Sequence, residues 1–241
     1  AAAHPIVHVG IADEAEPREA GLAVETNRVG RGVHLDYVRG IDVGEINAAG
    51  GVLGQDVVVN HTDSGDTSTD IASQSVDSLI SQNVDAIIGA ASSGVTATVI
   101  DAVVQSGTVM FSPANTSPDF TDYPDDGFYF RTAPSDVLQG RVMGDLVISD
   151  GHANVGIMAL QDPYGEGLAE NVTISVEEGG GTIAGGEAII YDPNAANYAT
   201  EVTQMAANAP DAIVLIGFAE TLTIIPELVA QGIGPQDVPL Y

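Results

Sequence analysis

Apolar positions along the chain alternate between two spacings. Four short runs in the first half are rich in Val, Ile and other apolar residues, which is the pattern of buried strands. They are residues 6–11, 56–60, 86–89 and 108–111. The segments between them carry apolar side chains at three- and four-residue spacing, which predicts amphipathic helices over residues 33–49, 67–82 and 94–105.

The same alternation continues in the second half of the chain. Strands are predicted over residues 154–160, 182–191, 212–217 and 238–241. Helices are predicted over residues 137–149, 166–178, 198–207 and 222–231, and Pro226 interrupts the last of these patterns. Strands that alternate with helices of this length form parallel sheets with helices on both faces, so the pattern predicts an α/β fold.

The alternation breaks once, over residues 112–131. This segment contains Pro113, Pro118 and Pro124 together with four Asp residues, which is the composition of a linker. The break divides the chain into a first α/β lobe, residues 1–117, a crossover or hinge, residues 118–131, and a second α/β lobe, residues 132–241. Because ligands of open parallel sheets bind at the carboxyl ends of strands, we expect a ligand between the two lobes.

The charge balance restricts the partners of the protein. The 241 residues include 34 acidic and 6 basic residues, with no Lys and no Cys, and the formal net charge is -28. A surface of this charge repels phosphate, which argues against nucleic acid and against an anionic membrane surface. The absence of Cys excludes disulfides and zinc-thiolate sites, and no apolar run approaches the length of a membrane span.

The same charge indicates the solvent in which the protein works. In dilute buffer so many like charges push a compact chain apart, whereas at molar salt the Debye length falls to roughly 3 Å and the repulsion is screened. We therefore expect a protein from a high-salt environment, such as that of a halophilic archaeon. An ordinary acidic protein is the alternative.

Motifs of enzyme chemistry are weak in this sequence. A phosphate loop with its Lys is absent, and the stretch from Gly30 to Leu35 lacks the third Gly of a dinucleotide fingerprint. The turn from Gly89 to Gly94 has the wrong spacing for a serine hydrolase, and the five His residues are scattered. No catalytic residue, metal site or cofactor is predicted, and a Rossmann-like enzyme fragment is kept as an alternative.

Ser92 and Ser93 lie between a predicted strand and a predicted helix. A Ser at this place caps the helix, since its hydroxyl accepts a hydrogen bond from a free backbone N–H group. The same helix N-terminus is also a site where a ligand carboxylate can bind without any Lys or Arg. Spacing alone leaves both interpretations open.

Several segments resemble one known family when they are taken in order. The first is the stretch from Ile46 to Gly54, INAAGGVLG, and the second is the turn from Gly89 to Gly94. They are followed by SPANTSP at residues 112–118, by FRT at residues 130–132 and by YGEG at residues 164–167. Together these segments resemble the branched-chain amino acid receptors of ABC importers, which are type I periplasmic binding proteins.

The resemblance implies a fold and a set of site residues. The fold is a pair of Rossmann-like lobes with parallel sheets, here lacking the C-terminal part, because family members continue beyond Tyr241 and complete the first lobe. The ligand carboxylate is expected at Ser92 and Ser93, and its ammonium at the segment of Ala114, Asn115 and Thr116, where the register is open by one residue. Tyr164 is expected to close the pocket from the second lobe, and Phe218 to form part of the same wall.

The resemblance also implies a function. The protein is expected to bind a small ligand, such as an amino acid, by lobe closure and to deliver it to the permease of an ABC importer. Its expected location is extracytoplasmic, with a lipid anchor in a segment that precedes Ala1. A ligand-sensing domain of a receptor shares this fold and is the second alternative.

Overall fold

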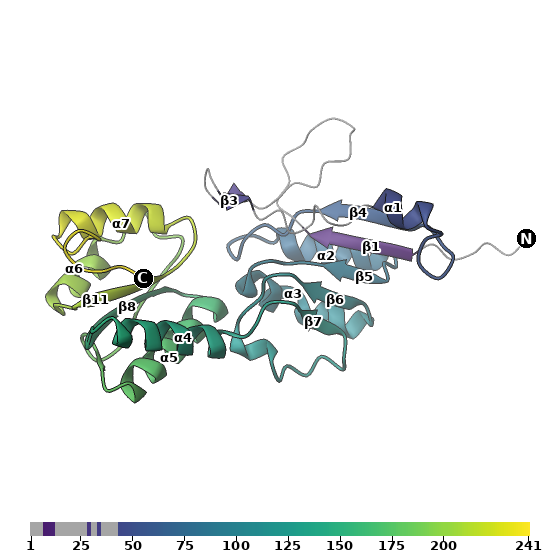
Figure 1. The fold of residues 1–241 in the computed structure, drawn as a ribbon. Coiled ribbons are helices and arrows are strands. Elements are labelled where there is room, and N and C mark those ends of the chain that lie inside the picture. The colour runs from purple at the N-terminus through teal and green to yellow at the C-terminus, as the bar shows by residue number, and fades with distance from the viewer. Residues whose placement is uncertain (1–6, 13–27, 30–32, 35–42) are drawn as a thin grey trace, which may run out of the picture. The chain divides into compact units, whose positions relative to one another are not determined.

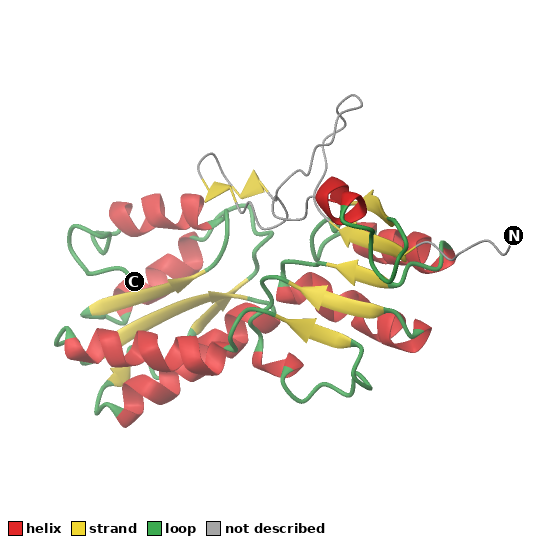
Figure 2. Cartoon of the chain, turned by 45° about the vertical axis from the view of Figure 1, so that its right-hand side comes forward, coloured by secondary structure: helices red, strands yellow, loops and turns green. Residues whose placement is uncertain are grey.

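The computed structural model of the chain describes residues 7–12, 28–29, 33–34 and 43–241 (Figure 1). The chain forms two compact units. Unit 1 consists of residues 1–115 and 123–133, and unit 2 consists of residues 116–122 and 134–241. Both units contain parallel sheets with helices beside them, as the cartoon in Figure 2 shows, so the predicted fold class is confirmed.

Unit 1 is built on a five-stranded parallel sheet in the order β4-β1-β5-β6-β7. The strands are β1 (Val7–Ala12), β4 (Val57–Thr62), β5 (Ala86–Ile88), β6 (Val109–Ser112) and β7 (Tyr129–Arg131). The predicted strands at residues 6–11, 56–60, 86–89 and 108–111 correspond to the first four of these. Because β1 lies between β4 and β5, the chain adds β4 on one side of β1 and then β5, β6 and β7 on the other.

Two helices cover one face of this sheet. They are α2 (Ile71–Ser81) and α3 (Ser93–Ser106), which pack against each other and against the strands (Figure 1). Ile87, Met110 and Tyr129 occupy adjacent register positions on three strands, and all three are buried. Phe111 and Phe130 alternate with them, and 37% and 48% of their surfaces are exposed. The opposite face of β6 and β7 therefore presents two apolar rings, which stack with centroids 6.4 Å apart.

The predicted helix over residues 33–49 is wrong in its first part. The structure has strand β3 (Val33–His34), paired antiparallel with β2 (Arg28–Val29), and the short helix α1 (Val43–Ala48), while residues 35–42 lie outside the described residues. A tertiary contact supports α1, because Asn47 Oδ1 accepts from the Val57 backbone N–H at 2.7 Å and Asn47 Nδ2 donates to the Val57 carbonyl oxygen at 3.0 Å. Helical spacing along this segment could not predict the pairing of β3 with β2 or the bonds of Asn47 to Val57, because both depend on residues outside the pattern.

The Pro-rich segment at residues 112–131 contains more regular structure than its composition suggests. The 3-10 helix η1 (Pro118–Phe120) lies in unit 2, and β7 is the edge strand of the sheet in unit 1. Tyr129 is buried, Phe130 is exposed and Arg131 is half-buried, so β7 shows strand alternation over three residues. This run is too short for a periodicity argument to separate it from a loop.

Unit 2 has a parallel sheet with helices on both faces. Its central strand β8 (Asn154–Leu160) pairs with β10 (Ile189–Tyr191), with β11 (Ala212–Ile216) and with the short β9 (Thr182–Ile183). Helix α5 (Pro163–Glu178) packs on one face with α4 (Asp136–Ser149) against it, and α6 (Ala199–Ala207) and α7 (Thr221–Ala230) lie on the other (Figure 1). The helices predicted at residues 137–149, 166–178, 198–207 and 222–231 are confirmed, with Pro226 inside α7.

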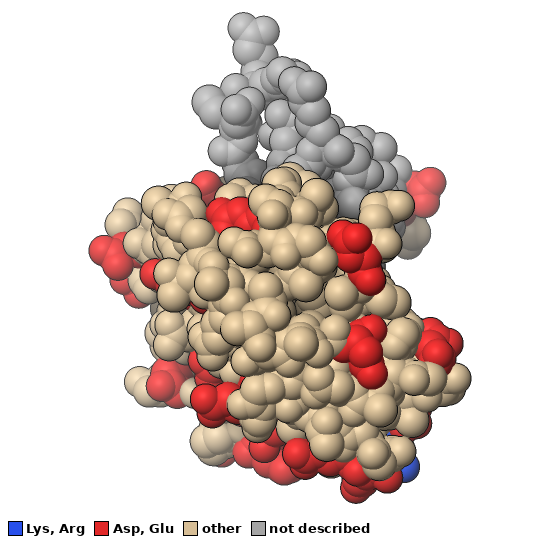
Figure 3. All heavy atoms as spheres, turned by 90° about the vertical axis from the view of Figure 1, so that its left-hand side faces the viewer, with Lys and Arg blue, Asp and Glu red and all other residues tan. Residues whose placement is uncertain are grey.

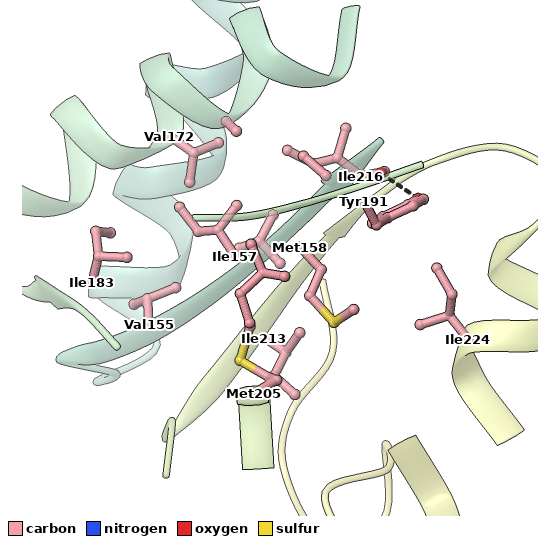
Figure 4. Close-up of a cluster of buried hydrophobic side chains, with 14 of the residues drawn as sticks. Val155, Ile157, Met158, Val172, Ile183, Tyr191, Met205, Ile213, Ile216 and Ile224 are labelled. Atoms are coloured by element: carbon pink, nitrogen blue, oxygen red, sulfur yellow. Dashed lines mark hydrogen bonds between the residues drawn. The ribbon is translucent and has the colours of Figure 1, made fainter. Parts of the chain in front are cut away.

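The core of unit 2 is contributed by all of these layers. Ile157 and Met158 of β8 are fully buried between the helices (Figure 4). Val172 of α5 closes the core from one side, and Met205 of α6 and Ile224 of α7 close it from the other. This apolar core fixes β8, β10 and β11 side by side, so that the loops after their carboxyl ends stand next to one another.

One strand prediction in unit 2 needs correction, and another is met at its start. The run over residues 182–191 is divided into β9 and β10, because Gly185 and Gly186 have φ angles of 83° and 91° and turn the chain. Residues 238–241 run parallel to β11, with a bridge between Ile213 and Leu240 and a backbone hydrogen bond from the Tyr241 N–H to the Ile213 carbonyl oxygen at 2.9 Å, so the predicted strand begins here. Among the described residues, no helix is long and apolar enough to cross a membrane.

Candidate functional site

The loop after β5 carries the two Ser residues that sequence reasoning selected. Ser92 is the N-cap of α3, and its Oγ accepts a hydrogen bond from the Val95 backbone N–H at 3.3 Å. Ser93 is the first residue of the helix, and only 3% of its surface is exposed. The helix starts one residue earlier than predicted. Of the two Ser residues that could cap it by their spacing, Ser92 is therefore the cap.

The loop after β6 is tied to the loop after β5 by buried hydrogen bonds. Ser112 Oγ donates to the Ala90 carbonyl oxygen at 2.7 Å and accepts from the Asn115 backbone N–H at 3.0 Å. Asn115 Nδ2 donates to the carbonyl oxygens of Ala90 and Ala91 at 3.1 and 2.9 Å. These bonds hold together the two turns that follow neighbouring strands, which are the turns expected to contact a ligand.

Asn115 also reaches the third strand of this edge. Its Oδ1 accepts from the Tyr129 hydroxyl at 2.9 Å, and both residues are buried. Burial raises the pKa of Tyr129 above its ordinary value, so the hydroxyl keeps its proton and donates. The side chain of Asn115 thus supports the loops from inside unit 1. Sequence reasoning missed Ser112 and Tyr129, whose roles depend on partners far away in the chain.

The predicted segment of Ala114, Asn115 and Thr116 is divided between the two units. Ala114 and Asn115 belong to unit 1, whereas Thr116 belongs to unit 2. Ala114 donates its backbone N–H to Ser112 Oγ at 3.3 Å, and the Thr116 carbonyl oxygen accepts from the Asp136 backbone N–H at 2.8 Å. The segment is therefore one of the points where the chain passes from one unit to the other.

Unit 2 brings the other two predicted residues together. Tyr164 lies in the first turn of α5, directly after β8, and Phe218 lies directly after β11. Their rings stack with centroids 5.3 Å apart and an angle of 19° between the ring planes. The parallel pairing of β8 with β11 is the reason that the two rings meet. That they form one wall of a ligand site stays a prediction.

Three carboxylates act electrostatically on Tyr164. Asp162 caps α5 by accepting from the Gly165 backbone N–H at 2.7 Å, and its burial raises the pKa of its carboxyl group in spite of that bond. The pKa of Tyr164 is raised to about 12, mainly by burial and then by the charges of Asp136, Asp162 and Glu220. The Tyr164 hydroxyl is therefore neutral across the physiological pH range.

Glu220 positions Phe218. Its Oε1 accepts from the Phe218 backbone N–H at 2.9 Å and lies 3.0 Å from the Tyr191 hydroxyl, which is also 2.8 Å from the Ile216 carbonyl oxygen. Sequence reasoning missed Glu220 and Tyr191, because no local pattern connects residues that lie 29 positions apart. Among the described residues, no cluster of three or more His, Asp and Glu side chains could hold a metal ion.

Comparison with known proteins identifies the family. The family described as "Periplasmic binding protein" matches residues 40–241, which is most of the chain. The chain belongs to this family. A Leu/Ile/Val-binding protein homolog of Brucella melitensis is 28% identical over 137 residues, which are 56% of this chain and 36% of that protein. Human metabotropic glutamate receptor 8 is 31% identical over 137 residues, which are 56% of this chain and 15% of the receptor.

The solved structures agree on the fold of this family member. A leucine binding protein from Thermotoga maritima has a TM-score of 0.74 and 20% sequence identity, and the match covers 94% of this chain and 61% of that one. The chain thus spans less than two thirds of the length of these relatives.

Proposed function

We propose that this periplasmic binding protein family member is a solute-binding protein, which binds a small ligand by closure of two lobes and performs no chemistry on it. The family match over residues 40–241 carries the proposal. The polar loops after β5 and β6 and the aromatic pair after β8 and β11 support it, because carboxyl ends of parallel strands are where ligands of such sheets bind.

We propose that the ligand is an amino acid and that the protein delivers it to an ABC importer. The Brucella relative is named as a Leu/Ile/Val-binding protein homolog, and the Thermotoga structure is that of a leucine binding protein. The proposed partner is the permease of the importer, and the proposed location is extracytoplasmic with a lipid anchor. A halophilic archaeon is the source that the net charge of -28 favours.

In the proposed complex, Ser92 and Ser93 hold the ligand carboxylate with the first N–H groups of α3, and the segment from Ala114 to Thr116 holds the ammonium. Tyr164 and Phe218 form the opposite wall. Residues 118–131 act as the hinge, and the ligand favours closure only by the difference between its affinities for the closed and open forms.

The test is calorimetric titration of the chain with the proteinogenic amino acids in molar NaCl. Ser93→Ala is expected to weaken binding by about tenfold or more, since a charge-assisted hydrogen bond contributes roughly 1.5–3 kcal/mol and 1.4 kcal/mol is one decade. His152→Gln is the control and should leave affinity within about a factor of two, because His152 lies at the opposite end of β8 from Tyr164. Failure of every amino acid to bind contradicts the amino-acid proposal.

A ligand-sensing domain of a receptor is the second candidate. The 31% identity to metabotropic glutamate receptor 8 over 137 residues favours it. Affinity capture from solubilised native membranes separates the two candidates, because an importer component recovers a permease and its ATPase, whereas a sensor recovers a signalling protein.

A further inference from the structure

Helix α4 turns its small residues inward and its larger apolar residues outward. Gly140 and Gly144 are buried against α5. Leu138, Val142 and Leu146 follow one another at four-residue spacing on the other face, and 55%, 59% and 44% of their surfaces are exposed. A surface helix normally places charged and polar side chains on this face. These three residues form an apolar ridge, the α4 ridge, which the described residues leave exposed.

One cation and one anion flank the α4 ridge. Arg141 is the single Arg or Lys residue of unit 2, and both Arg141 and Asp145 are exposed. Among the described residues, none accepts a hydrogen bond from the Arg141 guanidinium. Because four positions separate them, the two charges lie about one turn apart on the same flank of the ridge. The other Asp, Glu, Lys and Arg residues of unit 2 are all acidic, and Figure 3 shows many red side chains and little blue.

This combination of charges is self-complementary. A two-fold axis near the middle of α4 places two copies of the helix antiparallel, with ridge against ridge. Such an axis reverses the direction of the helix and keeps the charged flank on the same side of the contact. Arg141 of one copy then faces Asp145 of the partner subunit, and the reciprocal pair forms one turn away. A purely acidic partner would oppose Asp145 with a like charge, so the pattern favours a second copy of this chain.

We propose that α4 is the interface of a symmetric dimer, in which the α4 ridges of two copies pack antiparallel and two ion pairs between Arg141 and Asp145 fix the register. This inference goes beyond the proposed function, which concerns ligand binding. A contact of one helix with one helix is smaller than the roughly 1,200–2,000 Å² of standard interfaces, so the dimer should be weak, with a dissociation constant in the micromolar range or above. High salt should favour it, because screening reduces the repulsion between two chains of net charge -28.

Sedimentation velocity of the 241-residue chain in molar NaCl tests the proposal. Over about a hundredfold range of protein concentration, the chain should pass from monomer to dimer. Val142→Asp places a carboxylate in the middle of the ridge and should weaken the dimer by about tenfold or more. Val229→Asp is the matched control, because Val229 is a Val of α7 with 54% of its surface exposed. The control should leave the dissociation constant within about a factor of three, and circular dichroism checks that both variants are folded.

Exchange of the two charges tests the register of the dimer. Arg141→Asp and Asp145→Arg each put like charges opposite one another at both ion pairs, so each variant alone should dimerise about tenfold more weakly or worse. An equal mixture of the two variants should recover the dimer, because a copy with two acidic residues then meets a copy with two basic residues. A role confined to one helix cannot produce recovery on mixing.

Three results would overturn the inference. They are a monomer at every concentration, equal dissociation constants for Val142→Asp and Val229→Asp, and a mixture of the two charge variants that dimerises no better than either variant alone. In each case the α4 ridge is not a contact between copies. None of these results bears on the solute-binding function, which calorimetric titration decides independently.

Discussion

Replacement of Asn115 by Ala should destabilise the protein far more than an exposed Asn substitution. The side chain is fully buried and makes three hydrogen bonds, to the carbonyl oxygens of Ala90 and Ala91 and with the Tyr129 hydroxyl. After truncation, the Ala90 oxygen keeps the Ser112 hydroxyl as a donor, at 2.7 Å. The Tyr129 hydroxyl loses its bond to Asn115, and a lost intramolecular hydrogen bond costs about 0.5–1.5 kcal/mol.

We therefore expect Asn115→Ala to lower the free energy of unfolding by about 3 kcal/mol, with the lost bond to Ala91 included. Urea unfolding in molar salt, followed by circular dichroism, measures it. Tyr129→Phe should cost about 1 kcal/mol, and the double variant should cost less than the sum because the two residues share one bond. The control is Asn194→Ala, since Asn194 is exposed and should change stability by less than about 0.5 kcal/mol. Equal losses for Asn115→Ala and Asn194→Ala would refute the supporting role of Asn115.

Three further predictions concern packing, pH and salt. Gly144→Ala should destabilise unit 2 by about 2 kcal/mol or more in urea unfolding, because the added Cβ would lie 2.5 Å from Ser175 Cβ of α5, whereas Val142→Ala on the exposed side of α4 should cost below about 0.5 kcal/mol. The pKa of Tyr164 is raised from 10.0 to about 12, so the folded state holds this proton more tightly and the free energy of unfolding should fall as pH rises from 10 to 12. Tyr164→Phe should reduce that fall in denaturant titrations at alkaline pH. The same dependence of the unfolding free energy on pH in the variant and the unaltered protein contradicts the prediction. The melting temperature should rise from roughly 0.1 M to molar salt, since screening relieves the repulsion of a net charge of -28, and a salt-independent melting temperature contradicts the halophile interpretation.

The sequence by itself determined the parts of this protein that depend on neighbouring residues. Helical and strand spacing predicted four of the five strands of the parallel sheet in unit 1 and the helices of unit 2, because burial of one face imposes a period that is visible along the chain. The capping of α3 by a Ser was also predicted, since a cap involves residues within one turn.

Local patterns failed where a contact elsewhere in the chain decided the outcome. The chain does not form the helix that was predicted from residue 33. It forms strand β3 and, from Val43, helix α1, in which Asn47 is hydrogen-bonded to Val57. Strand β7 was missed because three residues show no usable period, and its place is set by pairing with β6.

The candidate site shows the same division. Tyr164 could be named from a motif and Phe218 from its place after a predicted strand, but their stacking follows from the pairing of β8 with β11. Asn115 was selected as a ligand contact, and only the tertiary structure shows that its side chain donates to the carbonyl oxygen of Ala90, 25 residues earlier. The hydrogen bond between Glu220 and Tyr191 is likewise visible only in the tertiary structure. Hydrogen bonds of a buried side chain are satisfied by whichever groups the fold brings near, and sequence distance carries no record of that choice.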